Sequence, residues 1–316
     1  MTKTSSKTRS DNQGLKALLN RVYLQRYLFL MSVPFIIWAI IFRYVPLYGW
    51  TMAFQEFRPG RGFFEQQWVG LAQFQLFLSD PLFWMVLRNT LVMSVLALVC
   101  GYTLPVIFAL MLNEIRMVKF KRIVQTISYL PHFVSWVVVA SIFTRLLATD
   151  GVVNDLLVFF RILDEPVQFL ARGEYFWAIA TIAEVWKTLG WSAIVFLAAM
   201  TAIDPALYEA ADVDGAGRFT KIWHITLPGI RTTYIVLLIM SIGWITSIGF
   251  ERQLLLGNVM TMQYAYVLDL YVLSYGLQLM RFSFGTAVGM ANSVLSITLL
   301  FLANRLAKKF GEATLV

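Results

Sequence analysis

Apolar runs of about twenty residues recur along the chain, and they constrain its fold more than any other feature. A helix needs about that length to cross the ~30 Å hydrocarbon core of a bilayer. The runs do not alternate apolar with polar residues, as the strands of a membrane barrel do. Hydrophobic residues make up 59% of the 316 residues and charged residues 14%, against about 25% charged residues in soluble domains. We therefore expect an all-α membrane protein.

Six of these runs are long enough to be transmembrane spans. They lie near residues 27–47, 85–112, 124–147, 176–202, 233–250 and 285–304. We expect both termini in the cytoplasm.

The remaining segments fall around these spans. Residues 1–26 combine a basic tail with a segment whose apolar residues follow helical spacing from Leu15, which predicts an amphipathic helix on the membrane lipid. We expect an extracytoplasmic loop at 48–84, a transmembrane core at 85–304 and a cytoplasmic tail at 305–316.

The distribution of charge supports this orientation. Cytoplasmic segments of membrane proteins carry an excess of Lys and Arg. With the N-terminus inside, the cytoplasmic segments hold 16 of the 26 basic residues but only 7 of the 18 acidic residues. The net charge of +8 therefore indicates membrane orientation and not a nucleic-acid partner.

Residues 259–280 are apolar enough to be taken for a seventh span. That span would place Asp269 in the middle of the membrane, at a cost of about 2.5–3.5 kcal/mol, and would put the basic C-terminal tail outside. We interpret the segment instead as an outer helix that rests on the bundle before the last span.

The chain has few residues for sites that depend on cysteine or histidine. Cys100 is its only cysteine, and His132 and His224 are its only histidines, so no disulfide framework or thiolate metal site is expected. No G-x-x-x-x-G-K-[S/T] or H-E-x-x-H sequence occurs, so we expect no nucleotide or metal site. Any ATPase that drives this protein must be another polypeptide.

A polar stretch at 204–228 separates the fourth span from the fifth. Asp204 is a good helix N-cap, and Pro205 suits the first helical position. Gly215 and Gly217 are expected to supply positive φ angles that end this helix. A short rigid helix of this kind suits the transmission of force, because a flexible loop would absorb the displacement.

We expect a second helix after this elbow, with Pro228 marking the entry to the fifth span. The predicted topology places the whole loop, 203–232, on the cytoplasmic face.

The same loop resembles a known family. It contains E-A-A, three residues, G, nine residues and I-x-L-P, with Glu209, Ala210, Ala211 and Gly215 at the first four motif positions. This spacing is similar to the signature loop of the permease subunits of binding-protein-dependent ABC importers. Other strings resemble the maltose-type branch for oligosaccharides, which includes LplB-like and alginate-importer-like permeases. These strings are VPLYGW (45–50), WVGLAQF (68–74), RNTL (88–91), ALMLNE (109–114), KFKRIVQTISYLPHFVSWVVV (119–139), WKTLGW (186–191) and FSFGTAVG (282–289).

The resemblance implies partners and a cargo. The chain would be a multi-pass permease in the plasma membrane of a bacterium, paired with a second homologous permease. Two ATPase subunits would bind MgATP, and an extracytoplasmic solute-binding protein would deliver a sugar, such as an oligosaccharide or an alginate fragment. By position, Glu209, Ala210, Ala211 and Gly215 would form the coupling helix in the ATPase cleft. The sequence leaves open whether the sugar is acidic or neutral.

Polar and aromatic residues in the fourth and fifth spans are candidates for a substrate path. Charged residues within a span face a bundle interior, a water-filled path or each other. Glu184 and Lys187 are three residues apart and can pair along the helix, while Trp186, Trp191 and Trp244 can stack on sugar rings. The alternative is an ion pair that only fixes helix packing.

Other residues receive structural interpretations. Gly285 and Gly289 in the sixth span have the spacing that allows close helix packing. We interpret His132 as a hydrogen-bonded structural residue, with a proton relay as the alternative. We interpret Glu251 with Arg252 as a solvated rim, with contact to the binding protein or the substrate as the alternative.

Two other classes of protein remain as alternatives. A self-sufficient secondary transporter or channel usually needs further spans, inverted repeats or broken helices at the middle of the membrane. A membrane-embedded enzyme needs a cluster of catalytic residues, and neither histidine has a carboxylate beside it in sequence.

Overall fold

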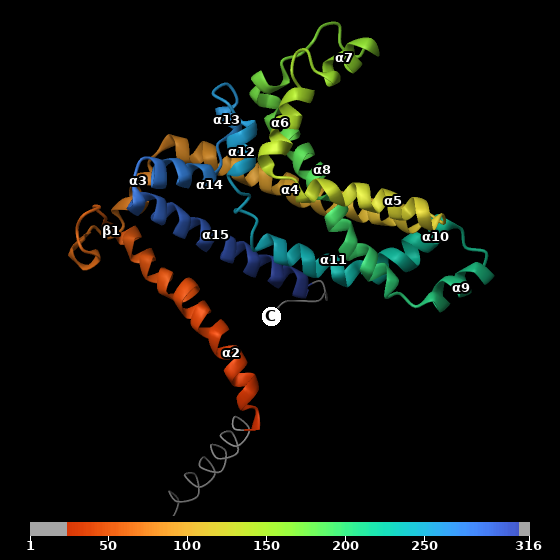
Figure 1. Ribbon diagram of the computed structural model, residues 1–316, viewed down its shortest axis with the longest axis horizontal. Helices are drawn as coiled ribbons and strands as arrows, with labels where there is room; N and C mark the ends of the chain where they lie inside the picture. Colours follow the sequence, from red (N-terminus) through yellow and green to blue (C-terminus); the bar gives the residue numbers. More distant parts are fainter. Residues whose placement is uncertain (1–23, 310–316) are drawn as a thin grey trace, which may run out of the picture. The chain divides into compact units, whose positions relative to one another are not determined.

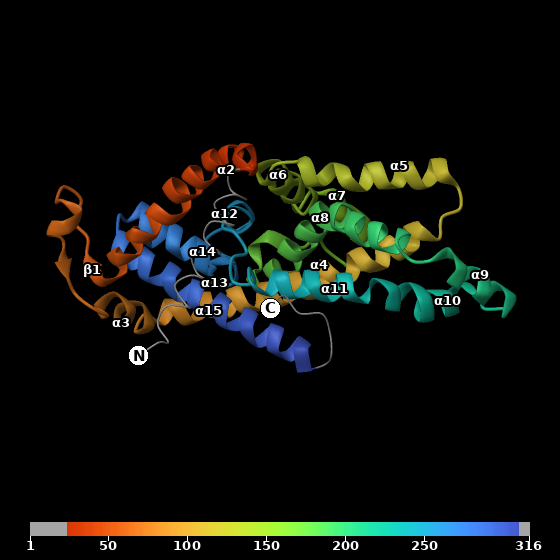
Figure 2. The ribbon, with the colours of Figure 1, turned by 90° about the horizontal axis from the view of Figure 1, so that it is seen from below.

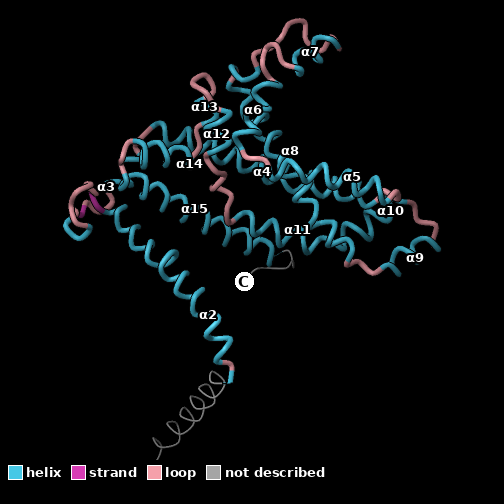
Figure 3. The backbone as a smooth tube through the Cα atoms, viewed as in Figure 1, coloured by secondary structure: helices cyan, strands magenta, loops and turns pink. Residues whose placement is uncertain are grey.

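The computed structural model describes residues 24–309. It divides into two units, one ending at Met52 and one beginning at Ala53, and each is described by itself. The predicted amphipathic helix at 15–23 and residues 310–316 lie outside the described part. The described chain is almost entirely helical (Figure 1), and its strands form one small hairpin (Figure 3). The predicted all-α fold is confirmed.

The described residues contain five helices that are long and apolar enough to cross a membrane. A sixth span results if one sharply bent helix pair is counted as a single crossing. The number of predicted spans therefore agrees with the structure, although two of the spans differ from the prediction in shape or in bounds.

The first unit is one continuous helical run. α2 (Arg26–Ala39) leads through a π-helical turn (Ile40–Tyr44) into a 3-10 stretch (Val45–Phe54) whose last two residues belong to the second unit. Its large apolar side chains are exposed, as expected of a helix that lies in lipid.

The second unit holds the other long helices. They are α4 (Pro81–Asn113), α8 (Phe176–Thr201), α11 (Leu227–Ile242) and α15 (Phe282–Lys309). α4 and α8 lie side by side (Figures 1 and 2). Ala109 of α4, Ala193 and Phe196 of α8 and Ile230 of α11 form one buried cluster, which joins the three helices.

The predicted third span is broken into two helices. α5 (Val118–Tyr129) continues through a 3-10 turn (Leu130–Phe133), and α6 (Trp136–Leu146) then leaves at a bend of 105°. Proline lacks an N–H and clashes with the preceding turn, so Pro131 explains the end of the first helix. Ser135 starts the second, because its hydroxyl accepts a hydrogen bond from the Val138 N–H. The span predicted at 124–147, in which Pro131 is expected to kink the helix, is therefore broken into two helices beside that proline.

The fifth span begins and ends earlier than predicted. A continuous helix covers Arg218–Ile242, so Pro228 lies inside it and does not mark its entry. A π-helical turn (Ile222–Thr226) precedes this proline. The wider turn accommodates a residue that cannot make the normal i→i−4 hydrogen bond. The same arrangement occurs in the first unit, where Pro46 follows the π-helical turn at Ile40–Tyr44.

The segment at 259–280 forms short helices and not the single outer helix that we expected. They are α13 (Met262–Ala265), α14 (Leu268–Tyr271) and a π-helical stretch (Val272–Gln278). Val267, Leu268 and Tyr271 are buried in a cluster with residues of α4 and α15. No helix here meets the length of a span, which agrees with the rejection of a seventh crossing.

Residues of α4 hold this buried segment in place. The Asn89 side-chain amide donates to the carbonyls of Gln263 (2.9 Å) and Tyr266 (3.0 Å). The Thr90 hydroxyl accepts from the Leu268 N–H at 2.8 Å. The RNTL string (88–91) thus anchors the segment at 259–280 to α4.

Asp269 of this segment is also held by the backbone. Its carboxylate accepts a 2.6 Å hydrogen bond from the Gly249 N–H. Burial raises the pKa of the Asp269 carboxyl, and the bond from Gly249 acts in the opposite sense.

Smaller elements complete the second unit. They are β1 (Gln55–Glu56), β2 (Gln67–Trp68), α3 (Ala72–Leu78), α7 (Val152–Phe159) and α12 (Glu251–Leu256), with 3-10 turns at Phe63–Glu65, Phe169–Ala171 and Gly173–Tyr175. The two strands are antiparallel, with Gln55 opposite Trp68. The predicted division at 1–26, 27–47, 48–84, 85–304 and 305–316 stays a prediction.

Candidate functional site

The loop between α8 and α11 forms an exposed helical elbow at one end of the second unit (Figures 1 and 2). Its first helix is α9 (Pro205–Val213), and α10 (Arg218–Lys221) starts the following long helix. The Asp204 carboxylate accepts from the Ala206 N–H at 2.9 Å, so the predicted N-cap is present. Gly215 has φ +73°, which only glycine adopts easily. Gly217 has φ −71° and caps α10, so its predicted positive φ is wrong.

Side-chain contacts tie α9 to the helix that follows. Asp212 forms an ion pair with Lys221. The hydroxyls of Tyr208 and Thr226 are hydrogen-bonded at 2.9 Å. These contacts join α9 to the long helix, so the elbow is a braced unit and not a loose connection.

The predicted coupling residues lie on the open side of this elbow. Glu209, Ala210 and Gly215 are exposed and Ala211 is half-buried. Large apolar side chains are exposed beside them, with Phe219 88% accessible. Exposed apolar residues gathered on a rigid element are typical of a surface that another protein covers.

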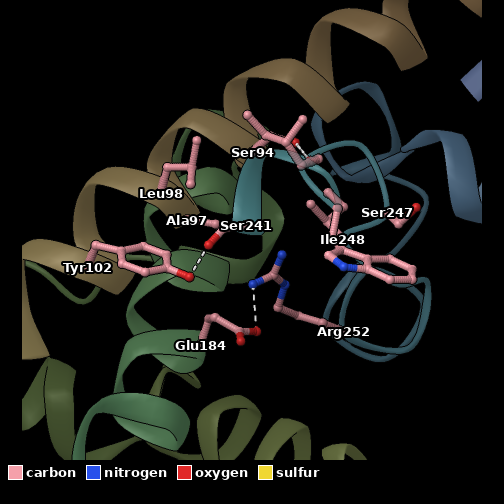
Figure 4. Close-up of a pocket in the computed structure, with 11 residues that line it drawn as sticks. Ser94, Ala97, Leu98, Tyr102, Glu184, Ser241, Ser247, Ile248 and Arg252 are labelled. Atoms are coloured by element: carbon pink, nitrogen blue, oxygen red, sulfur yellow. Dashed lines mark hydrogen bonds and ion pairs between the residues drawn. The ribbon is translucent and has the colours of Figure 1, made fainter. Parts of the chain in front are cut away.

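A second candidate site is a cavity of about 230 Å³ between α4, α8 and the chain that follows α11 (Figure 4). Its lining residues are Ser94, Ala97, Leu98, Tyr102, Glu184, Ser241, Trp244, Ile245, Ser247, Ile248 and Arg252. Tyr102 is hydrogen-bonded to Ser241, and Ser94 donates to the Ile245 carbonyl. These bonds connect α4 to the end of α11 and shape the cavity wall.

An ion pair lies in this cavity. Arg252 Nη1 donates to Glu184 Oε2 at 2.8 Å, and the Arg252 side chain is only 4% exposed, against 32% for Glu184. The solvated rim predicted at Arg252 is therefore wrong for that residue. Burial lowers the pKa of the Arg252 guanidinium and Glu184 raises it, but an arginine stays protonated in proteins.

Lys187 does not pair with Glu184, which corrects the ion pair predicted along α8. Its Nζ donates to the carbonyls of His132 (2.6 Å) and Val134 (2.7 Å). Those carbonyls lie at the break between α5 and α6, where helical hydrogen bonding stops. A cation there replaces missing hydrogen bonds and interacts favourably with the C-terminal end of the preceding helix.

The predicted aromatic residues separate into two groups. Trp244 lines the cavity and is 73% exposed. Trp186 packs against Phe143 at 5.9 Å between ring centroids, and Trp191 stacks on His132 at 4.6 Å. Neither of these two tryptophans lines the cavity, so the structure does not bring the five predicted path residues together.

His132 also differs from the prediction. Its Nδ1 atom is buried without a hydrogen-bond partner in the described chain. Stacking on Trp191 therefore holds the ring, and not the hydrogen bond that we expected.

The two glycines of α15 have different surroundings. A Cβ on Gly285 would lie 2.7 Å from the Cα of Gly276, whereas a Cβ on Gly289 would meet nothing within 4 Å in the described chain. Gly285 thus lies at a close backbone contact, and a packing role for Gly289 stays a prediction.

Nothing in the sequence indicates that Ser94 and Tyr102 of α4 line the cavity, because both lie within a long apolar run. The sequence points to Trp244 through the polar and aromatic residues near the end of the fifth span, and it places Arg252 near that end without showing that Arg252 is buried.

The comparison with known families decides the class of the protein. Residues 101–312 match the family described as "Binding-protein-dependent transport system inner membrane component". The chain belongs to this family. It is therefore a multi-pass inner-membrane permease subunit of a binding-protein-dependent importer, and not a self-sufficient channel or secondary transporter.

Individual relatives agree over nearly the whole permease. This chain is 45% identical to the polygalacturonan/rhamnogalacturonan transport system permease protein YteP of Bacillus subtilis (strain 168), over 94% of this chain and 92% of that protein. It is 42% identical to the protein LplB of the same organism, over 91% of this chain and 90% of that one.

Solved structures show the same fold. One is the crystal structure of a bacterial ABC transporter involved in the import of the acidic polysaccharide alginate, with a TM-score of 0.84 and 37% identity over 93% of this chain and 99% of that chain. Another is the bacterial alginate ABC transporter in complex with an alginate pentasaccharide-bound periplasmic protein, with a TM-score of 0.86 and 37% identity over 94% and 99% of the two chains.

Proposed function

We propose that this permease forms one half of the membrane path of an ATP-driven sugar importer. A second, homologous permease forms the other half, two ATPase subunits bind MgATP and dock on the elbow, and a solute-binding protein delivers the sugar. The permease itself binds no ATP and catalyses no reaction. The named cargoes of its relatives support a sugar oligomer: polygalacturonan and rhamnogalacturonan for YteP, alginate for the solved transporter, and arabinooligosaccharides for the protein AraP. These cargoes include acidic and neutral sugars, so they leave the charge of the substrate open.

The observation that carries this proposal is the braced, exposed elbow of α9. Its surface combines Glu209 with exposed apolar side chains such as Phe219 and Val213. Such a surface suits a partner with an apolar cleft and a basic residue. An ATPase subunit with that cleft binds α9, and Glu209 pairs with its basic residue.

The elbow and the cavity are connected through one continuous helix. Asp212 and Tyr208 of α9 contact Lys221 and Thr226 near the start of the helix at Arg218–Ile242. At the other end of that helix, Ser241 bonds Tyr102 in the cavity wall. Since a continuous helix moves as one body, a displacement of α9 moves the wall of the cavity. ATP binding and hydrolysis in the partner subunits thereby change the access to the path.

Purification and uptake together test the proposal. The tagged permease, expressed with the second permease, the ATPase and the binding protein from the same organism, should copurify with the permease and the ATPase. Liposomes containing that complex should take up sugar only with the binding protein outside and MgATP inside. Uptake by this chain alone in liposomes, or purification without an ATPase under conditions that retain the second permease, would contradict the proposal.

A further inference from the structure

The start of α5 holds a group of positive charges without ion pairs. Residues 116–122 contain four basic side chains, whereas no Asp or Glu occurs at 115–149. Within residues 24–309, none of the four basic side chains forms an ion pair. The four are Arg116, Lys119 and Arg122, which are exposed, and Lys121, which is half-buried.

The basic residues of the elbow differ in this respect, because each has a carboxylate of this chain beside it. Lys221 pairs with Asp212, and Arg218 Nε lies 4.0 Å from Oε2 of Glu114. Glu114 is the carboxylate next to the basic group in sequence, and its ion pair is with the elbow. Residues 114–122 thus carry four positive charges against one negative charge, and that negative charge is shared with Arg218.

α5 has one side that packs on the protein and one that does not. Ser128 marks the packed side, since a Cβ on Gly190 of α8 would lie 2.2 Å from the Ser128 carbonyl oxygen. On the opposite side, Phe120, Ile123 and Ile127 are 52%, 56% and 65% exposed. Their spacing of three and four residues places them in one stripe along the helix. This apolar stripe has no partner in the described chain, so lipid or another protein covers it.

The basic group lies at the start of this apolar stripe. Arg122 directly precedes Ile123, and Lys119 directly precedes Phe120. α5 starts at the end of the second unit that also carries the elbow (Figures 1 and 2), which we predict to face the cytoplasm. Long basic side chains keep their charge at the membrane surface while their stems cover apolar residues. This side of α5 thus presents cations at the membrane boundary and apolar side chains deeper in the membrane.

That order matches a phospholipid of the cytoplasmic leaflet, whose phosphate lies at the boundary and whose acyl chains lie deeper. A headgroup with a net negative charge fits best, because a zwitterionic headgroup carries its own cation and leaves the basic group unneutralised. Basic clusters at the cytoplasmic end of a span attract anionic lipids for this reason. The ATPase fits less well, since we assign it a basic residue opposite Glu209, and like charges repel.

We propose that the start of α5 binds an anionic phospholipid of the cytoplasmic leaflet. Arg116 and Arg122 bind the phosphate, because the planar fork of arginine donates two hydrogen bonds to one phosphate group. An acyl chain of the same lipid lies along Phe120, Ile123 and Ile127. This site is separate from the elbow and from the cavity, so it adds a partner to those of the proposed function and does not depend on the sugar.

Photolabelling of the assembled complex tests the inference. Both permeases with their ATPases are placed in phosphatidylcholine nanodiscs that contain a trace of one lipid probe, either phosphatidylglycerol or phosphatidylcholine with the same photoreactive acyl chain. Mass spectrometry then measures the labelling of residues 117–128. The phosphatidylglycerol probe should label this segment at least about fivefold more, since each cation near a membrane surface contributes about that factor. The ratio of the two labelling yields should decrease as salt increases.

Paired substitutions separate this site from a general effect of charge. Arg116→Gln with Arg122→Gln should reduce the labelling ratio to near one. Arg116→Lys with Arg122→Lys keeps both charges, should retain the preference, and serves if the glutamine pair fails to assemble. Arg145→Gln with Arg172→Gln, which changes two exposed arginines outside the site, is the matched control and should label like the wild type.

Competition identifies the source of the phosphate. Unlabelled phosphatidylglycerol should displace its photoreactive counterpart from residues 117–128, whereas inorganic phosphate should not, because it lacks the acyl chain that the apolar stripe binds. Displacement by inorganic phosphate would show a site for free phosphate and would overturn the inference.

Equal labelling of the wild type by the two probes would also overturn it, as would an unchanged ratio in the glutamine pair or an equal decrease in the control pair. Absence of labelling at 117–128 by either lipid would mean that a protein subunit covers this side of α5. Loss of the ATPase from the complex in the glutamine pair, with the labelling ratio unchanged, would assign the basic group to the ATPase instead.

Discussion

Arg252 and Glu184 lie 68 positions apart in the chain and form a 2.8 Å ion pair that joins α12 to the middle of α8. Through this pair, the segment that follows α11 is fixed to a membrane helix at the cavity. Glu184 is thus paired with Arg252 and not with Lys187, which lies three residues further along α8 and donates to the carbonyls at the break in the third span.

This ion pair should show strong coupling in a double-mutant cycle. Arg252→Met leaves the Glu184 charge without its partner, so we expect a loss of about 2–5 kcal/mol in stability. Glu184→Leu combined with Arg252→Met should recover most of that loss, because an apolar pair of similar volume replaces a buried ion pair at little cost. Thermal unfolding of the purified complex measures both effects, and additive losses in the double variant would show that the two residues do not interact.

Lys187 should stabilise the break between α5 and α6. Lys187→Met removes the bonds to the His132 and Val134 carbonyls, each of which involves a charged donor, so we expect a loss of about 2–4 kcal/mol. Hydrogen exchange at residues 130–136 should also become faster. Lys119→Met, at an exposed position of α5, is the control. Unchanged exchange at the break in Lys187→Met would show that other contacts hold it.

The two glycines of α15 provide a matched pair for packing. Gly285→Ala places a Cβ 2.7 Å from the Gly276 Cα, whereas Gly289→Ala places one in open space. We expect Gly285→Ala to cost about 1–3 kcal/mol, as overpacking does, and Gly289→Ala to be neutral or slightly stabilising because alanine favours helix. Thermal stability of the isolated subunit compares them. Equal losses at both positions would mean that a partner surface covers Gly289 or that Gly285 can relax.

Asp269 should make the stability of the permease depend on pH. Its pKa is raised in the folded state by burial, so its contribution is fully present below the ordinary pKa of about 3.9 and is lost as the pH rises through the folded pKa. Asp269→Asn keeps an acceptor for the Gly249 N–H but removes the ionisation. Its melting temperature relative to that of the wild type should therefore increase from pH 4 to pH 7. A constant difference over this range, or a wild type that gains relative stability at high pH, would contradict this account.

Much of the fold could be predicted from sequence because a helix that crosses a bilayer needs about twenty apolar residues. Apolar length fixed α4, α8 and α15 within a few residues, and the Asp204-Pro205 and Gly215 signals placed α9. Local signals could not predict the third span, since Pro131 indicates a kink but its 105° bend also depends on Ser135 and on Lys187 from a distant helix.

The cavity was less predictable for a related reason. Charge placement within α8 suggested that Glu184 pairs with its near neighbour Lys187. The actual partners come from the third span and from residue 252, and spacing along one helix carries no information about them. Trp186 and Trp191 do not line this cavity, because a single sequence does not show which side of α8 faces it; their place on a substrate path stays a prediction.

The most direct test of the whole account is ATP hydrolysis by the reconstituted complex with Glu209→Lys in this permease. Glu209 is exposed on α9, and we propose that it pairs with a basic residue of the ATPase. The reversed charge should therefore leave the complex in the membrane but abolish the stimulation of hydrolysis by loaded binding protein. Glu165→Lys, the same change at an exposed position outside the elbow, should retain that stimulation. Normal stimulated hydrolysis and uptake in Glu209→Lys would contradict the claim that α9 couples the ATPase to the sugar path.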